Sequence, residues 1–598
     1  MLSTSSYSKT IIKENISRYW AISVLGYVGY FLVGIMPVLM NFKSFRSIAS
    51  YAESTMNGNS FSVNAIIVTL AVIASAAVFG YLHEQPSSNA MHSMPTDRGR
   101  LFRSAIISGW ILMIIPLVLF AFSMLFLRGA SSPAGAMNEE SIMDLVYGGN
   151  TTAKEIYSLP HAFGFILTSI ISASYAFAVS CLAAVLAGKK VIHVLLSLFI
   201  FILPPALVLT FDGLCSEYLF GFKETDINYG WLNATIAAMM KEDFEIQVGF
   251  SVFFIIITLA LLAASLWIYK KIKLERIGNS TTFPLVGDVL VVLLTLLSTI
   301  GFANIFALMI GNDNDGQKGM RFAIAAVISS AIYFAVMRMI ADSSPAIFNL
   351  KNLKKYLLCL GILLVILAFT AFDITNYGKK VPAPDEVASV HIDTSFPNGL
   401  YNIDEDCTDP SAIESLLELQ QAIIDERNVE FKKNDEGYED YSTETFILVW
   451  KLKNGKEISR KYDAVEDENH TKTGAALKNL YNTSGFRNLL TLNADEEIKR
   501  CKNIGIYNAY SEDEPEVTNI KKADWEGLIG ALNEDLAGAS YEQMANYCEW
   551  EDDQEDRTDC YTVDLSYRAE DDSAGKSYVI REKDKNTVEY LKGKGYIK

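Results

Sequence analysis

Charged side chains are scarce inside the long apolar segments of this chain. The few ionisable residues found there lie near segment ends, where long side chains can reach water: Asp288, Arg321, Arg338, Asp373, His161 and His193. Transporters driven by an ion gradient usually keep carboxylates or histidines deep in the membrane, because a charge there is costly and is tolerated for a function. The scarcity therefore argues against a proton- or sodium-coupled mechanism.

The sequence also lacks the motifs of common catalytic and nucleotide-binding sites. It contains no GxSxG, CxxC or kinase signature, so an enzyme is not supported and no cofactor is expected. The string nearest to a Walker A motif, residues 574–577, has Glu570 where the first glycine belongs. Any ATPase activity that drives this protein must therefore come from a separate partner.

No metal site is expected either. The string HEQPS, which starts at His83, has Ser87 where the second histidine of HExxH belongs, and Pro86 would break the helix that aligns the zinc ligands. His83 and His92 are nine residues apart and have no cysteine nearby, so we interpret both as surface histidines.

Charge and hydropathy are divided unevenly along the 598 residues, half of which are hydrophobic. Residues 375–598 contain 27 Lys and Arg against 48 Asp and Glu, a net charge of −21, whereas residues 1–374 contain 24 against 21, a net charge of +3. The chain therefore consists of an apolar body, residues 1–374, and an acidic soluble body, residues 375–598. We expect no nucleic-acid partner for such a chain.

The apolar body contains nine segments long enough to cross a lipid bilayer, each needing roughly 20 residues. They lie near residues 19–40, 63–82, 105–127, 161–187, 191–211, 248–269, 287–311, 320–340 and 356–374. The first has a long apolar run and no A-x-A-like site after it, so we expect it to remain as an anchor.

The distribution of basic residues predicts the orientation of these spans. With the N-terminus inside, the inner segments hold 16 of the 24 Lys and Arg of the apolar body. The positive-inside rule therefore predicts a multi-pass protein of the cell membrane with a cytoplasmic N-terminus. Because the number of spans is odd, the acidic body would be extracellular.

Residues 83–104, which we call the coupling segment, are polar although a span lies on either side of them. Residues 94–97 predict a turn that is followed by a helix. In that helix Leu101 and Phe102 can pack on a partner protein, while the neighbouring arginines stay solvated. A second interpretation, a basic inner loop that only fixes the topology, stays open.

The coupling segment resembles the loop between the second and third spans in permease subunits of ABC-2-type exporters from Gram-positive bacteria. Its core, HSMPTDRGRLF, matches the pattern HS[LM]PxxRxxLF of that family in the same position. The basic string YKKIKLERIG, residues 269–278, is similar to the segment that the family places before its seventh span. The string FDITNYGKKVPAPDEVASVHI, after the last span, is similar to the family's passage into an outer domain.

The resemblance implies a permease subunit that couples ATP hydrolysis by a separate ABC ATPase to substrate movement. The residues that it assigns to ATPase coupling are His92, Ser93, Met94, Pro95, Arg98, Leu101 and Phe102. It further implies a second permease subunit, as a homodimer or heterodimer, and export of or resistance to peptides or drugs. The alternative is a membrane-anchored sensor or binding protein whose extracellular domain recognises a ligand, although a sensor needs only one or two spans.

The acidic body has the periodicities of an extracellular α/β domain. It contains a hairpin closed by residues 454–455 and a helix capped by Asp409. The order β-α-β-β-α occurs twice with an offset of about 114 residues, which predicts two similar lobes, residues 385–495 and 500–598.

Four of the seven cysteines lie in the acidic body. In an oxidising location Cys548 and Cys560 could form a disulfide that closes the acidic loop between them. This loop lacks the glycine and the spacing of an EF-hand, so we interpret it as a solvated run of charge.

Overall fold

The computed structural model contains the helices that the apolar segments predict. The residues that it describes are 7–40, 55–126, 159–225, 227–240, 247–272, 278–309, 315–342, 344–394, 406–429, 442–508, 518–538, 541, 561–567, 576–580 and 584–597. Within these ranges nine helices are long and apolar enough to cross a membrane. The prediction of a polytopic helical membrane protein is therefore confirmed.

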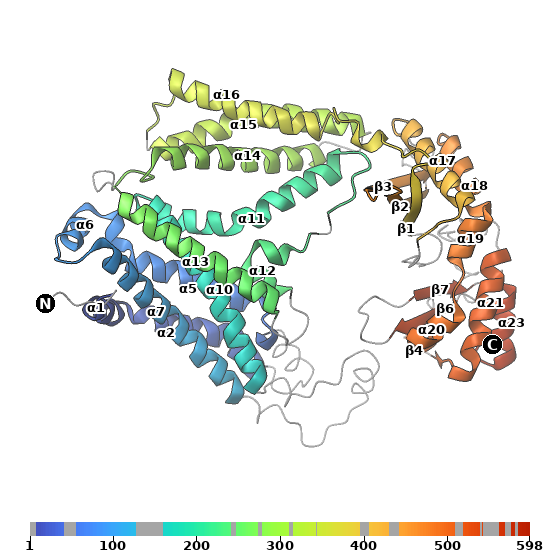
Figure 1. Ribbon diagram of the computed structural model, residues 1–598, viewed down its shortest axis with the longest axis horizontal. Coiled ribbons are helices and arrows are strands. Elements are labelled where there is room, and N and C mark those ends of the chain that lie inside the picture. Colours follow the sequence, from blue (N-terminus) through green and yellow to red (C-terminus); the bar gives the residue numbers. More distant parts are fainter. Residues whose placement is uncertain are drawn as a thin grey trace. The chain divides into compact units, whose positions relative to one another are not determined.

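The apolar body is built entirely of helices in the residues that the structure describes, and Figure 1 labels most of them. They are α1 (Lys9–Tyr19), α2 (Ala21–Tyr30), the π-helix η1 (Phe31–Ile35), α3 (Met36–Met40), α5 (Phe61–Val78), η2 (Gly80–His83), α6 (Gln85–His92), α7 (Arg98–Phe126), α10 (Leu159–Leu186), α11 (Lys190–Tyr218), η3 (Tyr229–Leu232), α12 (Ala234–Met239), α13 (Val248–Lys271), α14 (Pro284–Met309), α15 (Asp315–Asp342) and α16 (Leu350–Phe369). The first span is formed by α2, η1 and α3 together, Ala21–Met40.

Helix α10 is the most enclosed span, and it packs against α5, α7 and α13. Its alanine and serine residues let these neighbours approach closely, as small residues do in membrane bundles. On α5 the small residues Ala71 and Ser75, which are one helical turn apart, are fully buried.

The prolines of two spans lie inside continuous helices. Pro116 belongs to α7, and Pro204 and Pro205 belong to α11. Proline removes a backbone donor and crowds the preceding turn, which kinks a helix. Helix α11 is accordingly bent along its length (Figure 1).

Helices α14, α15 and α16 lie side by side (Figure 1). The hydroxyl groups of Ser330 and Tyr356 lie 3.2 Å apart and join α15 to α16. Ion pairs at one end of the three helices join them further.

The acidic body contains two antiparallel sheets with helices packed against them (Figure 1). Its elements are η5 (Tyr377–Lys379), β1 (Val387–Thr394), α17 (Pro410–Glu426), β2 (Ser442–Leu452), β3 (Glu457–Glu466), α18 (Thr471–Asn482), α19 (Ser484–Leu490), α20 (Ala494–Arg500), β4 (Cys501–Asn508), β5 (Thr518–Asn519), η6 (Lys522–Asp524), α21 (Trp525–Gly538), β6 (Tyr561–Tyr567), β7 (Lys576–Ile580) and α23 (Lys585–Lys594). The strand orders are β1-β2-β3 and β5-β4-β6-β7. We call β1 to α18 the first lobe and β4 to α23 the second lobe.

The local predictions for this body agree with its structure. Gly455 closes the β2–β3 hairpin with a φ of 79°, in the left-handed region that favours glycine. Asp409 caps α17 by accepting hydrogen bonds from the backbone N–H groups of Ser411 and Ala412. The order β-α-β-β-α occurs in each lobe, and helices α19 and α20 and strand β5 are additions that the repeat did not predict.

The chain divides into two compact units, and the second comprises residues 212–225, 306–324 and 364–598. Within this unit the segment after α11 is fitted tightly to strand β3. The backbone N–H of Lys461 donates to the carbonyl of Gly221, and the rings of Phe220 and Tyr462 pack 5.3 Å apart. Gly221 has a φ of 74°, and a Cβ at this position would lie 2.7 Å from the Tyr462 ring. Only glycine satisfies both constraints.

Candidate functional site

The coupling segment folds as a short helix, a turn and the start of a span. Helix α6 begins with Pro86 in its first turn, as the fixed φ of proline favours. The turn follows at residues 93–97, and Asp97 caps α7 by accepting a hydrogen bond from the N–H of Gly99 at 3.0 Å. The predicted turn and helix are confirmed.

His92, at the end of α6, is held by hydrogen bonds on both ring nitrogens. Its Nδ1 lies 2.8 Å from the carbonyl oxygen of Ser88, which can only accept, so Nδ1 carries the proton. Nε2 is then an acceptor and receives the hydroxyl of Tyr269 at 3.1 Å. Tyr81 in turn donates to the Tyr269 oxygen at 3.1 Å. This chain of hydrogen bonds ties the turn to η2 and to the end of α13.

Leu101 and Phe102 are buried in the helical bundle, so the expectation that they pack on a partner protein is wrong. Phe102 is 0% exposed and Leu101 is 3% exposed. The ring of Phe102 stacks on Tyr269 at 5.0 Å and packs on Phe79 at 5.1 Å. Both residues lie in the first turns of α7, on the side that packs against the bundle, and they therefore support the turn from within.

The residues that remain for a partner lie in the turn itself. Ser93, Met94 and Pro95 are exposed, and Met94 keeps 43% of its surface in contact with solvent. Arg98 is half-buried, and its guanidinium donates to the carbonyl of Ile272, which follows α13, at 3.4 Å. The structure thus separates the seven predicted residues into an exposed turn and the residues that anchor it.

The residues that anchor the turn also contact the basic string YKKIKLERIG, residues 269–278. Tyr269 is the first residue of the string YKKIKLERIG, of which residues 273–277 lie outside the described ranges. Its contacts with His92 and Phe102 bring the two motifs together, although 177 positions separate Tyr269 from His92.

Helix α1 also supports this region. The backbone N–H of Ser8 donates to the Ser104 hydroxyl at 2.8 Å, and the Asn15 amide donates to the Ser108 hydroxyl at 3.0 Å. Both acceptors lie on α7 just after the turn. The start of α7 is therefore enclosed by α1 as well as by the bundle.

His83 and His193 form a buried pair that the sequence did not reveal. His83 is 7% exposed and His193 is 0% exposed, so the expectation that they lie at the surface or reach water is wrong. Nε2 of His193 lies 2.9 Å from the carbonyl oxygen of Ser180 and must donate to it. Nδ1 of His193 is then an acceptor and receives Nε2–H of His83 at 3.2 Å. Both imidazoles are neutral in this arrangement.

Hydroxyl groups surround this histidine pair. Ser180 and Ser197 lie 2.9 Å apart, and Ser197 donates to the carbonyl of His193 at 2.7 Å. Burial, followed by the nearby His193 and Lys190, lowers the pKa of His83 to about 3. The network connects the start of the coupling segment with α10 and α11. Its only sequence signal was the presence of polar residues in otherwise apolar helices.

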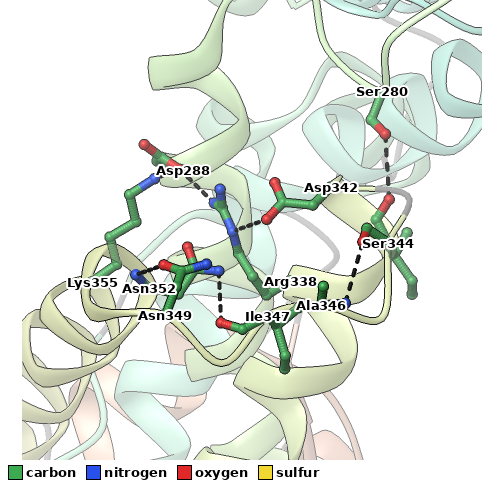
Figure 2. A network of polar contacts seen from close by, with 11 residues as sticks. Ser280, Asp288, Arg338, Asp342, Ser344, Ala346, Ile347, Asn349, Asn352 and Lys355 are labelled. Carbon is green, nitrogen blue, oxygen red and sulfur yellow. Dashed lines mark hydrogen bonds and ion pairs between the residues drawn. The ribbon is translucent and has the colours of Figure 1, made fainter.

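An ionic network joins α14, α15 and α16 at the end where α14 begins (Figure 2). The guanidinium of Arg338 lies 2.6 Å from a carboxylate oxygen of Asp288 and 2.8 Å from one of Asp342. Lys355 approaches the same oxygen of Asp288 at 2.6 Å. The Arg338 side chain is 11% exposed, so it is mostly paired within the protein and does not extend into water. Asn349 caps α16 by accepting from the N–H of Asn352 at 2.9 Å.

These features lie at one end of the membrane bundle, which we call the basic end. Backbone hydrogen bonds from Gly188 to Ser280 and from Thr282 to Leu186 bring the start of α14 beside the α10–α11 turn. The basic residues at this end are Arg98, Arg100, Arg103, Lys189, Lys190, Lys270 and Lys271. Lys and Arg residues are therefore concentrated at this end.

The two remaining predicted residues, Cys548 and Cys560, lie outside the described residues. Among the residues that the structure describes, no three His, Cys, Asp or Glu side chains are grouped as metal ligands.

The chain matches no protein-family model, no curated protein and no solved structure at a significant level. Its class therefore follows from its own features: it is a polytopic helical membrane protein with nine candidate spans among the described residues.

Proposed function

We propose that this chain is the permease subunit of an ATP-driven ABC exporter of the cell membrane. Its N-terminus and basic end would face the cytoplasm, and its acidic body would be extracellular. A separate ABC ATPase would bind the basic end and supply the energy, since no nucleotide motif occurs in the sequence.

The observation that carries this proposal is the exposed turn at residues 93–96, which is anchored to several spans at once. Tyr269 and Arg98 tie it to the end of α13, Phe102 packs beneath it, and His83 connects its base to α11. A loop that served only to fix topology would need its charge but not this set of anchors. A partner that pushed on the turn would move α6, α7, α11 and α13 together.

Two substitutions distinguish the role of the exposed turn in binding from the role of the buried residues in stability. Met94→Glu changes an exposed side chain, so we expect normal folding and weaker co-purification with the ATPase. Phe102→Ala removes a fully buried ring, and we expect it to lower the free energy of unfolding by about 3–5 kcal/mol. Phe348→Glu is the matched control, because Phe348 is 93% exposed in the turn before α16.

The measurements are the thermal stability of each variant in detergent, its co-purification with the ATPase, and the ATP hydrolysis rate of the complex. The coupling role of the turn would be refuted if Met94→Glu and Phe348→Glu gave the same co-purification and the same hydrolysis rate as the wild type.

Orientation and assembly can be tested directly. Cysteine at Ser87 should react with an impermeant reagent only from the cytoplasmic side, and cysteine at Gly455 only from outside. Because an ABC motor closes two nucleotide-binding domains, we expect two permease subunits in the particle, as a homodimer or with a sister subunit. A transport-competent complex with a single membrane subunit would contradict this assembly.

A further inference from the structure

A cavity of about 520 Å³ lies within the compact unit that contains the acidic body. Its walls come from residues 216–224 at and after the end of α11, from residues 371–373 after α16, and from α17, β3 and α18 of the first lobe. The volume falls in the range of about 300–1,000 Å³ that is typical of small-ligand pockets. Two membrane helices thus lead directly into the walls of this cavity.

The walls are fixed by hydrogen bonds and do not depend on a ligand for their shape. Tyr462 is 2% exposed, and its hydroxyl donates to the carbonyl of Gly378 at 2.8 Å. Glu426 is 6% exposed and accepts from the backbone N–H groups of Lys472 and Thr473 at 2.9 and 2.8 Å. A preformed cavity of this kind binds a ligand at a smaller entropic cost than a mobile one.

Aromatic rings form the apolar part of the lining. Phe220 packs on Tyr462, and Tyr218 stacks on Phe322 with ring centres 4.3 Å apart. Phe372 lines the cavity and is 57% exposed. Such rings accept apolar groups and also attract cations through their faces.

The charged lining is predominantly acidic, with five carboxylates against Arg427 and Lys461. Lys461 is paired with Glu224 at 3.8 Å, whereas Arg427 lies 5.2 Å over the Phe220 ring and its Nη1 is buried without a hydrogen-bond partner. The carboxylates exceed the cations by three, so the lining favours a positively charged ligand.

The carboxylate of Asp373 also indicates a positively charged ligand. One of its carboxylate oxygens accepts the N–H of Tyr377 at 2.7 Å, while the other, Oδ2, is buried without a hydrogen-bond partner. Its backbone is held in the left-handed region with a φ of 38°. Strained residues with unsatisfied polar atoms are found preferentially at binding sites, where a donor on the ligand relieves them.

We propose that this cavity binds a basic peptide, with an ammonium or guanidinium group among the carboxylates and an apolar side chain against the aromatic rings. The idea that such a peptide is cargo or a signal for the exporter rests on the proposed function. Binding itself does not, because it needs neither the ATPase nor transport.

The test measures binding to the purified full-length chain in lipid nanodiscs without an ATPase. The probe is a fluorescein-labelled tetrapeptide amide of alternating arginine and tryptophan, followed by fluorescence anisotropy, and the comparison peptide carries glutamate in place of arginine. Glu224→Gln with Asp463→Asn removes two charges from the lining. Glu414→Gln with Glu457→Gln is the matched control, since it removes two charges from exposed positions of the first lobe outside the lining.

We expect saturable binding of the basic probe, weaker by about tenfold in the lining variant and nearly unchanged in the control variant. Ser216→Trp, which fills the cavity from the end of α11, should abolish it. Three results would overturn the inference: no saturable binding to the wild type, equal binding of the glutamate peptide, or equal losses in the lining and control variants. A failure here leaves the Met94→Glu test untouched, so the two proposals can fail independently.

Discussion

The hydroxyl of Tyr269 lies 3.1 Å from Nε2 of His92 and donates a hydrogen bond to it. The same ring stacks on Phe102, so one side chain at the end of α13 holds both the end of α6 and the start of α7. The exposed turn between them cannot shift without disturbing this contact.

Tyr269→Phe should test the polar half of the contact. The variant keeps the stacked ring but removes the hydroxyl, which leaves His92 without a donor and Tyr81 without an acceptor. We expect the free energy of unfolding to fall by about 1–2 kcal/mol, measured by thermal denaturation in detergent. Tyr81→Phe is the control, since it removes only the outer hydrogen bond and should cost less. Equal effects of the two substitutions would show that the bond to His92 contributes nothing.

The buried histidine pair predicts a loss of stability in acid. The folded-state pKa of His83, about 3, is lower than its ordinary value of 6.5, so the unfolded chain binds more protons between these two pH values. The contribution of neutral His83 to the free energy of unfolding is therefore fully present above pH 6.5. It falls as the pH is lowered, by about 1.5 kcal/mol from pH 6.5 to 5. His83→Gln keeps a donor for His193 but does not titrate, so its stability should depend less on pH. Parallel pH profiles for the variant and the wild type would contradict this account.

A buried carboxyl in the first lobe predicts the opposite dependence. Burial, with the nearby Glu466, raises the pKa of Glu444 from 4.5 to about 8, although Tyr481 donates to it at 3.3 Å. The folded protein then binds more protons than the unfolded chain between these values, and its stability falls as the pH rises. We expect a loss of about 2 kcal/mol between pH 6 and 8, which Glu444→Gln should remove. Hydrogen exchange of strand β2 in the full-length protein measures this loss of stability. The same pH dependence of exchange in Glu444→Gln and in the wild type would count against the raised pKa.

The ionic network should be asymmetric in its energetic contribution. Asp288→Asn leaves Arg338, whose side chain is only 11% exposed, without its closest carboxylate, and we expect a loss of about 2 kcal/mol. Lys355→Met removes a partner that is 34% exposed and should cost less than about 1 kcal/mol. Thermal denaturation at low and high salt compares the two. A larger effect of Lys355→Met would reverse the assignment of Arg338 as the central residue.

Features determined by neighbouring residues in the chain could be predicted from the sequence. The spans follow from long apolar runs, the cap of α17 from Asp409 and Pro410, and the β2–β3 hairpin from Asn454 and Gly455. In each case the interactions that form the element join residues that are close together in the chain.

Features that depend on tertiary packing could not be predicted. The residues of the His83 and His193 pair are 110 positions apart, and nothing local to either residue indicates its partner. Phe102 was expected to face a partner because helical periodicity gives the spacing of side chains but not the direction in which a helix turns its faces. That direction is set by the contact with Tyr269, which comes from a distant span.

The fit of Gly221 against strand β3 has a consequence for biosynthesis. Its hydrogen-bond partner, Lys461, is 240 positions later in the chain. At about 5–20 residues per second, the ribosome needs roughly 12–48 s to synthesise the intervening chain. During that interval α11 has been made while its C-terminal end still lacks the surface that covers Phe220. The segment after α11 therefore reaches its final packing only after translation has passed β3, so a chain that ends before β3 leaves Phe220 without its contact with Tyr462.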